Sequence, residues 1–279
     1  MLQLPKDYEL ITRGQAAIAV HGRYRDGLMA QGIDNPDLLL SSIATHPSAS
    51  GRGAVPCLPI EGFPGERMMV RRYLRGGLLR FVNRDLYLDG QRSFRELAIT
   101  VAAGRSGVPT VEILAAVSIK AAGPGYRCFL FSKELAGCID LPAYLLGQAA
   151  AATFTDDKQR ALKEAALAVR LMHDRGFYHG DLNMKNILVN AAEPKNLYII
   201  DWDKSQHFEK LSDDQRRANA QRFCRSLIKL AGTGLPVNED DAAAFLRAYR
   251  DDDRFVQACT KQLHRTVAVR RGFWKLLGS

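Results

Sequence analysis

Three oxygen-bearing side chains follow one another within a short part of this chain. Asp181 lies in the stretch His179–Leu188, which reads HGDLNMKNIL, Asn186 follows it by five residues, and Asp201 ends the apolar run Tyr198–Ile200. A carboxylate can orient a hydroxyl group and accept its proton, while magnesium prefers oxygen ligands. The set therefore predicts phosphoryl transfer to a hydroxyl, with Asp181 as base and Asn186 and Asp201 as metal ligands. Any one of the three could instead cap a turn, so the hypothesis depends on their order and spacing.

The same stretch resembles the catalytic and metal loops of the kinase-like superfamily, where H-x-D-x-x-x-x-N precedes an apolar strand that ends in Asp. We expect His179 to orient the loop through hydrogen bonds rather than to carry protons. In related enzymes a basic residue at the position of Lys185 reaches the transferring phosphate. The resemblance thus gives His179 and Lys185 supporting catalytic roles.

A kinase also needs groups that hold the nucleotide. Gly51, Arg52 and Gly53 form a short glycine-rich segment whose backbone could approach phosphates, although it is not a full G-x-G-x-x-G and could be a plain turn. Arg71 stands where the V-A-I-K lysine of a kinase would stand, and it could pair with phosphates and with Glu96. Arginine and lysine differ in geometry, and Arg71 could also be a solvated strand residue.

The elements expected to position these groups begin with a β-rich part. The apolar runs Ala54–Ile60 and Met68–Tyr73, separated by a Gly- and Pro-containing turn, predict a hairpin. One helix is expected over Ser93–Ala103, opened by a capping box between its first residue and Glu96. Cys128–Ser132 is typical of a strand.

Helical patterns dominate after about residue 137. Apolar residues at helical spacing predict a helix over Thr155–Arg175, with its first residue as N-cap and Gly176 as its end. Ile187–Val189 and Leu197–Ile200 indicate a second hairpin. Further helices are expected at about 212–231, 239–250 and 253–269.

The predicted fold class is α+β, a bilobal protein-kinase-like fold. We expect a nucleotide-binding N-terminal lobe over residues 1–135, containing a β-sheet and one helix, and a mainly helical C-terminal lobe over residues 136–279 that carries the catalytic and metal loops. The hinge is expected near residues 133–137. We find no internal repeat or flexible linker.

Composition is that of a folded protein, with 47% hydrophobic and 25% charged residues among 279. The five cysteines are scattered and form no C-x-x-C pair, so we interpret them as reduced. The start of the chain lacks a signal-peptide pattern, and no apolar run reaches the roughly 18 residues of a spanning helix, which predicts a cytoplasmic protein. The net charge of +9 favours an anionic partner.

With these pieces in order, the chain resembles the bacterial lipopolysaccharide core kinases, and among them the 3-deoxy-D-manno-octulosonic acid (Kdo) kinases. The resemblance spans roughly Gly51 to Lys229 and is carried by the catalytic stretch and by the segments Gly51–Gly53, Val70–Leu78, Ser93–Leu97 and Gly107–Pro109. It implies ATP and Mg²⁺ as cofactors, and transfer of the γ-phosphate to a sugar hydroxyl of the inner core, on Kdo attached to lipid A. It also implies work at the cytoplasmic face of the inner membrane.

Two departures accompany this resemblance. Trp202-Asp203 follows the metal aspartate in place of Phe-Gly or Phe-Asp, and we interpret Trp202 as a packing substitute. The first fifty residues match no motif. Two alternatives therefore stay open: another small-molecule kinase of this fold, of the heptose, aminoglycoside or choline type, or an inactive pseudokinase that binds nucleotide or lipid.

Two groups of basic residues suggest where the protein would bind an anionic glycolipid and a membrane surface. Eight arginines lie between Arg67 and Arg95, and residues 267–277 mix Arg and Lys with Phe, Trp and Leu. Such mixtures are typical of interfacial segments, so we expect peripheral membrane contact there. The arginines could equally form a solvated face. No spacing indicates a nucleic-acid module, and no obligate protein partner is evident.

Overall fold

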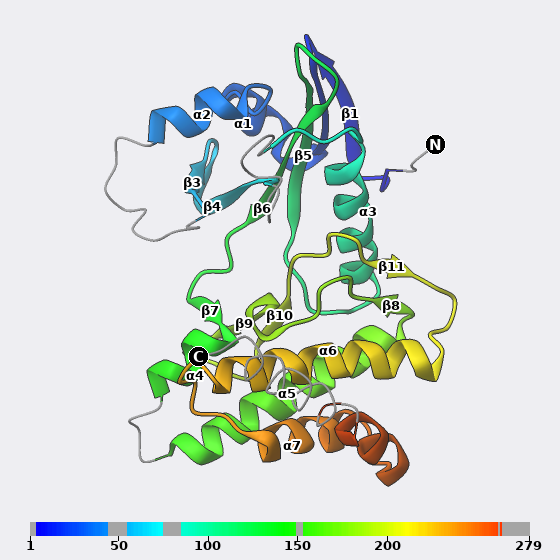
Figure 1. Ribbon diagram of the computed structural model, residues 1–279. Helices are drawn as coiled ribbons and strands as arrows, with labels where there is room; N and C mark the ends of the chain where they lie inside the picture. Colours follow the sequence, from blue (N-terminus) through cyan, green and yellow to red (C-terminus); the bar gives the residue numbers. More distant parts are fainter. Residues whose placement is uncertain (1–3, 44–54, 75–84, 149–152, 262, 264–279) are drawn as a thin grey trace, which may run out of the picture. The chain divides into compact units, whose positions relative to one another are not determined.

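The structure is a computed structural model that describes residues 4–43, 55–74, 85–148, 153–261 and 263. The chain divides into two compact units (Figure 1). The first comprises Met1–Arg105 and Val111–Leu135, and the second comprises Ser106–Thr110 and Ala136–Ser279. We describe each unit separately.

An antiparallel sheet forms the centre of the N-terminal unit, in the order β1-β2-β5-β6-β4-β3. Its strands are β1 (Tyr8–Arg13), β2 (Ala16–His21), β3 (Cys57–Ile60), β4 (Phe63–Arg72), β5 (Ile113–Lys120) and β6 (Tyr126–Lys133). The predicted hairpin and the predicted strand are β3-β4 and β6. The fifty N-terminal residues, which matched no motif, supply β1 and β2 and two of the helices.

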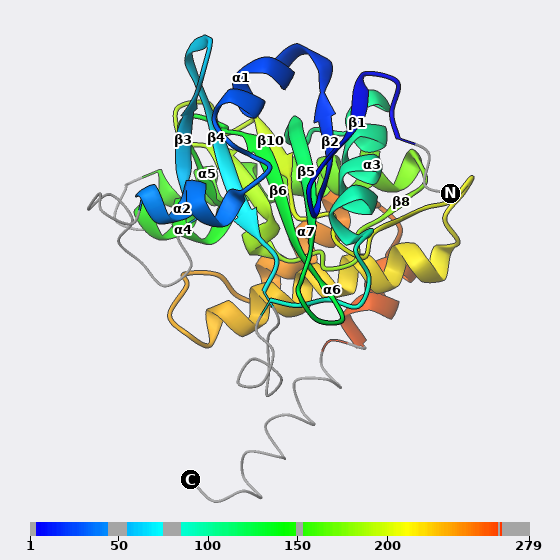
Figure 2. The ribbon, with the colours of Figure 1, turned by 90° about the horizontal axis from the view of Figure 1, so that it is seen from above.

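Helices cover both faces of this sheet (Figure 2). On one face lie α1 (Arg25–Ala30) and α2 (Pro36–Ile43), and on the other lies α3 (Arg92–Arg105). Seven of the eight residues of the central strand β5 are therefore buried. The sequence predicted only one helix here, because α1 and α2 are too short to show a clear helical period.

Successive side chains of strand β4 point to opposite faces of the sheet. Met68 and Val70 are buried in the core on the side of α1, while Arg71 points to the side of α3 and pairs with Glu96. The predicted capping box is wrong, because Ser93 is the second residue of α3 and not its cap. Its hydroxyl donates to the carbonyl oxygen of Val117, 3.2 Å away, so it fastens α3 to β5.

The C-terminal unit is built on long helices. They are α4 (Leu141–Gln148), α5 (Phe154–Asp174), α6 (Asp213–Ala231) and α7 (Glu239–Tyr249), and residues 253–261 are also helical. Between α5 and α6 lie short strands: β8 (Phe177–Tyr178), β9 (Ile187–Asn190), β10 (Leu197–Ile199) and β11 (Gln206–His207). β9 pairs with β10 and with β7 (Cys138–Asp140), and β8 pairs with β11. The second predicted hairpin is thus β9-β10.

Helix α5 delivers the chain to the catalytic stretch. Its buried face packs against α7, and Gly176 follows its end with a φ of +81°, a conformation that glycine adopts without strain. The N-cap is Thr153 rather than the predicted Thr155, which lies inside the first turn. The Thr153 hydroxyl donates to the Asp157 carboxylate, 2.7 Å away, instead of capping a backbone N–H.

In the part of the chain that the structure describes, no helix has both the length and the apolar character to cross a bilayer.

Candidate active site

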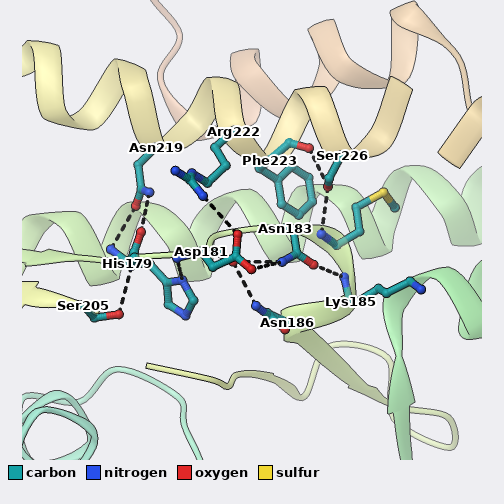
Figure 3. Close-up of polar contacts among 12 residues, drawn as sticks. His179, Asp181, Asn183, Lys185, Asn186, Ser205, Asn219, Arg222, Phe223 and Ser226 are labelled. Atoms are coloured by element: carbon teal, nitrogen blue, oxygen red, sulfur yellow. Dashed lines mark hydrogen bonds and ion pairs between the residues drawn. The ribbon is translucent and has the colours of Figure 1, made fainter. Parts of the chain in front are cut away.

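The predicted catalytic stretch is the connection between β8 and β9 (Figure 3). It contains a single 3₁₀ turn, Met184–Asn186, which Asn183 caps by accepting a hydrogen bond from the Lys185 N–H at 2.9 Å. The Asn183 amide also donates to the Asp181 carbonyl oxygen, 2.9 Å away, and to its carboxylate, 3.3 Å away. Short-range side-chain bonds of this kind favour turns over regular structure, and they hold the loop in one shape.

His179 organises the loop from within. Its ring is fully buried, Nδ1 accepts the Asp181 N–H at 3.1 Å, and Nε2 lies 3.0 Å from the Ile200 carbonyl oxygen. Because Nδ1 accepts a hydrogen bond, the ring proton is on Nε2, and the Nε2–H donates a hydrogen bond to the Ile200 carbonyl oxygen. The ring is therefore in a neutral tautomer. Burial lowers the pKa of His179 from its ordinary value, so the neutral form is also the favoured one. His179 is therefore placed to orient Asp181.

The metal candidates Asn186 and Asp201 are tied to the same network through Ile200. The Asn186 amide donates to the Asp181 carbonyl oxygen, 2.9 Å away, and its backbone oxygen accepts the Ile200 N–H at 3.0 Å. Ile200 is thus held on one side by Asn186 and on the other by His179, and Asp201 follows it directly with a φ of +64°. Because the amide nitrogen of Asn186 is engaged, its side-chain oxygen is the atom that could bind a metal, and Asp201 offers a carboxylate. A pair of hard oxygen donors fits Mg²⁺.

Gly180 allows the loop to approach the segment after Asp201. A Cβ at position 180 would lie 2.6 Å from the Asp203 carbonyl oxygen and 2.7 Å from the backbone of Lys204. The Gly180 N–H donates to the Ser205 hydroxyl at 3.0 Å. A side chain at this position would therefore push the catalytic loop and the metal segment apart.

Trp202 fills the space behind the metal aspartate. Its ring is 1% exposed and lies against Phe177 and His179, and its Nε1–H donates to the Thr110 hydroxyl and to the Ile199 carbonyl oxygen, at 2.9 and 3.1 Å. A buried tryptophan needs such an acceptor for its N–H. The packing role expected for Trp202 agrees with these contacts.

One face of α6 lies along the loop and supports it (Figure 3). Asn219 accepts the His179 N–H at 3.1 Å and donates to the His179 carbonyl oxygen at 2.8 Å, and the Ser226 hydroxyl accepts the Met184 N–H at 2.9 Å. Residues seven apart lie on the same face of a helix. These bonds satisfy backbone groups of the loop that are turned away from solvent and have no strand partner.

Arg222 lies between them on this face and reaches the catalytic carboxylate. Its Nη1 is 3.0 Å from Asp181 Oδ1, and the side chains of Arg222 and Asp181 are 41% and 61% exposed. Asp181 thus remains accessible to a substrate. Sequence reasoning did not identify Asn219, Arg222 or Ser226. The one signal available was a buried-face asparagine within an otherwise amphipathic helical pattern.

The candidates for contact with the nucleotide and its phosphates come from both units, and each is described within its own unit. In Figure 3 the exposed Lys185 side chain extends away from Asp181 and Asn186. In the N-terminal unit Arg71 forms an ion pair with Glu96, which is 3% exposed and also accepts from the Tyr73 hydroxyl. Burial, with the Glu96 charge beside it, holds the pKa of Tyr73 well above its usual value. Gly51, Arg52 and Gly53 lie outside the described residues.

Comparisons of the sequence with known proteins agree on one family. Residues 61–249 match the model of the Lipopolysaccharide kinase (Kdo/WaaP) family. The 3-deoxy-D-manno-octulosonic acid kinase of Actinobacillus succinogenes is 31% identical over 73% of this chain and 84% of its own length. The enzyme of the same name from Haemophilus influenzae (strain PittEE) is 30% identical over 72% and 83%. Among solved structures, WaaP in complex with acyl carrier protein aligns with a TM-score of 0.51 at 17% identity, covering 74% of this chain and 82% of that one.

Proposed function

Because the chain belongs to the lipopolysaccharide kinase (Kdo/WaaP) family, we propose that it phosphorylates a hydroxyl of 3-deoxy-D-manno-octulosonic acid (Kdo) in the inner core of lipopolysaccharide, on Kdo attached to lipid A, with ATP as the donor. The observation that carries the proposal is the Asp181 carboxylate, which is oriented by the loop and yet 61% exposed. Its neighbours are the oxygen donors that phosphoryl transfer needs.

In this mechanism Asp181 accepts the proton of the acceptor hydroxyl as the hydroxyl oxygen attacks the γ-phosphorus, and the bond from that phosphorus to the β–γ bridging oxygen breaks to release ADP. His179 keeps the Asp181 backbone in place from its buried position, and Asn183 bonds one carboxylate oxygen. Positioning supplies much of the catalysis in phosphoryl transfer, where the protein does little covalent chemistry. A rigid loop with an accessible carboxylate suits that requirement.

Asn186 and Asp201 would hold Mg²⁺, which when bound neutralises charge on the ATP phosphates. In the N-terminal unit Arg71, kept in place by Glu96, would contact the nucleotide phosphates, together with the backbone of Gly51, Arg52 and Gly53. We assign nucleotide binding to this unit for that reason. Lys185 would meet the transferring phosphate by a change of rotamer, since lysine side chains carry several freely rotating bonds.

The decisive experiment compares wild type with Asp181→Asn. Both are incubated with labelled ATP, Mg²⁺ and a Kdo-bearing lipid A precursor, and with heptose, aminoglycoside and choline acceptors. We expect the wild type to label the Kdo lipid alone and Asp181→Asn to lose about 10²- to 10⁴-fold in kcat, the usual contribution of a general base. Asp214→Asn is the matched control, because Asp214 lies on α6 with its side chain 83% exposed.

If the wild type labels another acceptor instead, the chain is a different small-molecule kinase of this fold. Absence of any transfer by the wild type would support the inactive alternative, and full activity of Asp181→Asn would contradict the assigned base.

A glycolipid substrate would place the reaction at a membrane. We propose that the chain acts peripherally at the cytoplasmic face of the inner membrane, where lipid A precursors with Kdo and ATP meet.

A further inference from the structure

Arg222 differs from the other arginines of α6 in the acid that it contacts. Arg216 pairs with Asp174 and Arg217 with Asp214, and both of these acids lie outside the catalytic loop. Arg222 instead pairs with the carboxylate of Asp181, across 41 residues of sequence. A cation has thus been placed directly beside the group to which the acceptor hydroxyl must come.

The guanidinium of Arg222 has donors to spare. It carries five N–H bonds in a planar fork, and one nitrogen, Nη1, contacts Asp181 Oδ1. Among the residues that the structure describes, Asp181 is its one acidic partner, and 41% of its side chain is exposed. The remaining N–H groups can therefore bind a second anion without breaking the contact to Asp181.

The surface next to Arg222 on α6 is also positive. Arg225 and Lys229 follow at the helical spacings of three and seven residues, so they continue the face that contains Arg222. No acid pairs with either of them in the part of the chain that the structure describes. An anionic ligand near Asp181 would meet this positive face, whereas a neutral sugar would gain nothing from it.

We propose that Arg222 recognises the carboxylate of the acceptor sugar and so determines specificity for an acidic sugar; this inference rests on the proposed function. The acceptor named by the relatives is an octulosonic acid, whose carboxylate is ionised at neutral pH. Arginine binds carboxylates through two parallel N–H···O bonds, which fixes orientation as well as position. With the carboxylate on Arg222, the sugar is held beside Asp181, where one of its hydroxyls meets the base.

The test compares a Kdo-bearing lipid A precursor with the same lipid whose Kdo carboxylate has been converted to its methyl ester. We expect wild-type kcat/KM to be about 10- to 100-fold lower for the ester, the range of a charge-assisted hydrogen bond pair. Arg222→Gln should treat acid and ester within about threefold of each other. Arg222→Lys keeps the charge but not the fork, so it should discriminate to an intermediate degree.

The matched control is Arg217→Gln, which removes an arginine of the same helix that pairs with Asp214 and should keep the wild-type ratio. If Arg222→Gln loses activity but keeps the wild-type ratio of acid to ester, Arg222 only positions Asp181 and the inference is wrong. Should Arg222→Gln fail to fold, Arg222→Lys decides, because a wild-type ratio in that variant would overturn the inference. Equal use of acid and ester would overturn the role of Arg222 and leave the proposed function standing, whereas use of neither would overturn both.

Discussion

Two buried histidines share one asparagine behind the catalytic loop. Asn219 Oδ1 lies 2.9 Å from His173 Nε2 and 3.1 Å from the His179 backbone nitrogen. The Tyr249 hydroxyl completes the set, 2.8 Å from His173 Nδ1. Every member is paired when His173 is neutral, so the network rigidifies the base of the loop.

This network makes stability depend on pH. Burial lowers the pKa of His173 from 6.5 to about 4, a fall that the Asn219 bond opposes; of the nearby charges, Arg216 adds to the fall and Asp174 opposes it. The folded pKa is below the unfolded one, so the unfolded state binds the proton more readily. The contribution of neutral His173 to the free energy of unfolding is therefore fully present above about pH 6.5. It is lost as the pH falls from there toward about 4, and the loss is at most about 3 kcal/mol.

Urea unfolding of the wild type between pH 7.5 and 4.5 measures this slope. His173→Gln should lower stability at pH 7.5 and flatten the pH dependence, because the group that takes up the proton is gone. His207→Gln is the control, since His207 lies on the surface and stacks on Phe177. A variant His173→Gln with the wild-type slope would show that other groups control the acid sensitivity.

At the scale of single residues, the sequence identified groups by their chemistry and order, but it identified few of their partners. It predicted the pairing of Arg71 with Glu96, because a strand and a following helix in one motif bring them together. It placed the Ser93 and Thr155 caps wrongly. A cap depends on one backbone hydrogen bond, whose position shifts by a residue or two without any change in the apolar pattern.

Among the elements, the catalytic loop and the segment 203–205 depend on a close approach that only glycine permits. Gly180→Ala would bring a Cβ to within 2.6 Å of the Asp203 carbonyl oxygen, so backbone must move. We expect the displaced Asp181 to cost on the order of 10²-fold in kcat/KM, the effect of a misplacement of about 1 Å. Steady-state kinetics and thermal unfolding are measured together, to separate lost activity from lost folding.

Gly147→Ala gives the matched control for this substitution. Gly147 lies in α4 with no atom within 4 Å of a Cβ, so alanine should leave the rate unchanged and stabilise the helix slightly. If Gly180→Ala were as active as Gly147→Ala, the close approach would have no part in positioning the base.

The fold class was predicted correctly, the β-rich and helical parts from element patterns and the protein-kinase-like type from the resemblance of the catalytic stretch. A β-rich N-terminal lobe followed by a mainly helical C-terminal lobe of the protein-kinase-like type is confirmed, as is membership of the lipopolysaccharide kinase family. Long amphipathic helices and alternating strands bury enough apolar surface for their periods to be visible. The short helices α1 and α2 lack that length, and so they were not predicted. The strands β1 and β2 were missed although each has six residues, because β1 is mostly exposed and β2 mostly buried, so neither shows a regular alternation.

For the molecule as a whole, the net charge of +9 and the proposed glycolipid substrate make a prediction about membranes. The chain should bind vesicles that contain anionic lipid, and binding should fall between 0.1 and 1 M salt as the screening length shortens from about 10 to about 3 Å. The basic and aromatic residues 267–277 lie outside the described part of the chain, so their contribution is predicted from sequence alone.

Co-sedimentation of the full chain and of a chain without residues 267–279 tests this. The shortened chain lacks Arg270, Arg271 and Lys275 together with Phe273 and Trp274, and it should bind anionic vesicles more weakly. Vesicles of neutral lipid are the control, and they should bind both chains poorly. If the shortened chain binds anionic vesicles as well as the full chain does, residues 267–279 do not contribute to membrane binding.

The sequence by itself determined the reaction class and the family. Asp181, Asn186 and Asp201 stand in one short stretch, and hydrogen bonds between near neighbours give that stretch its shape. Only the tertiary structure decided what faces Asp181 from outside. Arg222 meets it because α6 packs along the loop, and a contact between elements depends on packing that no local pattern records.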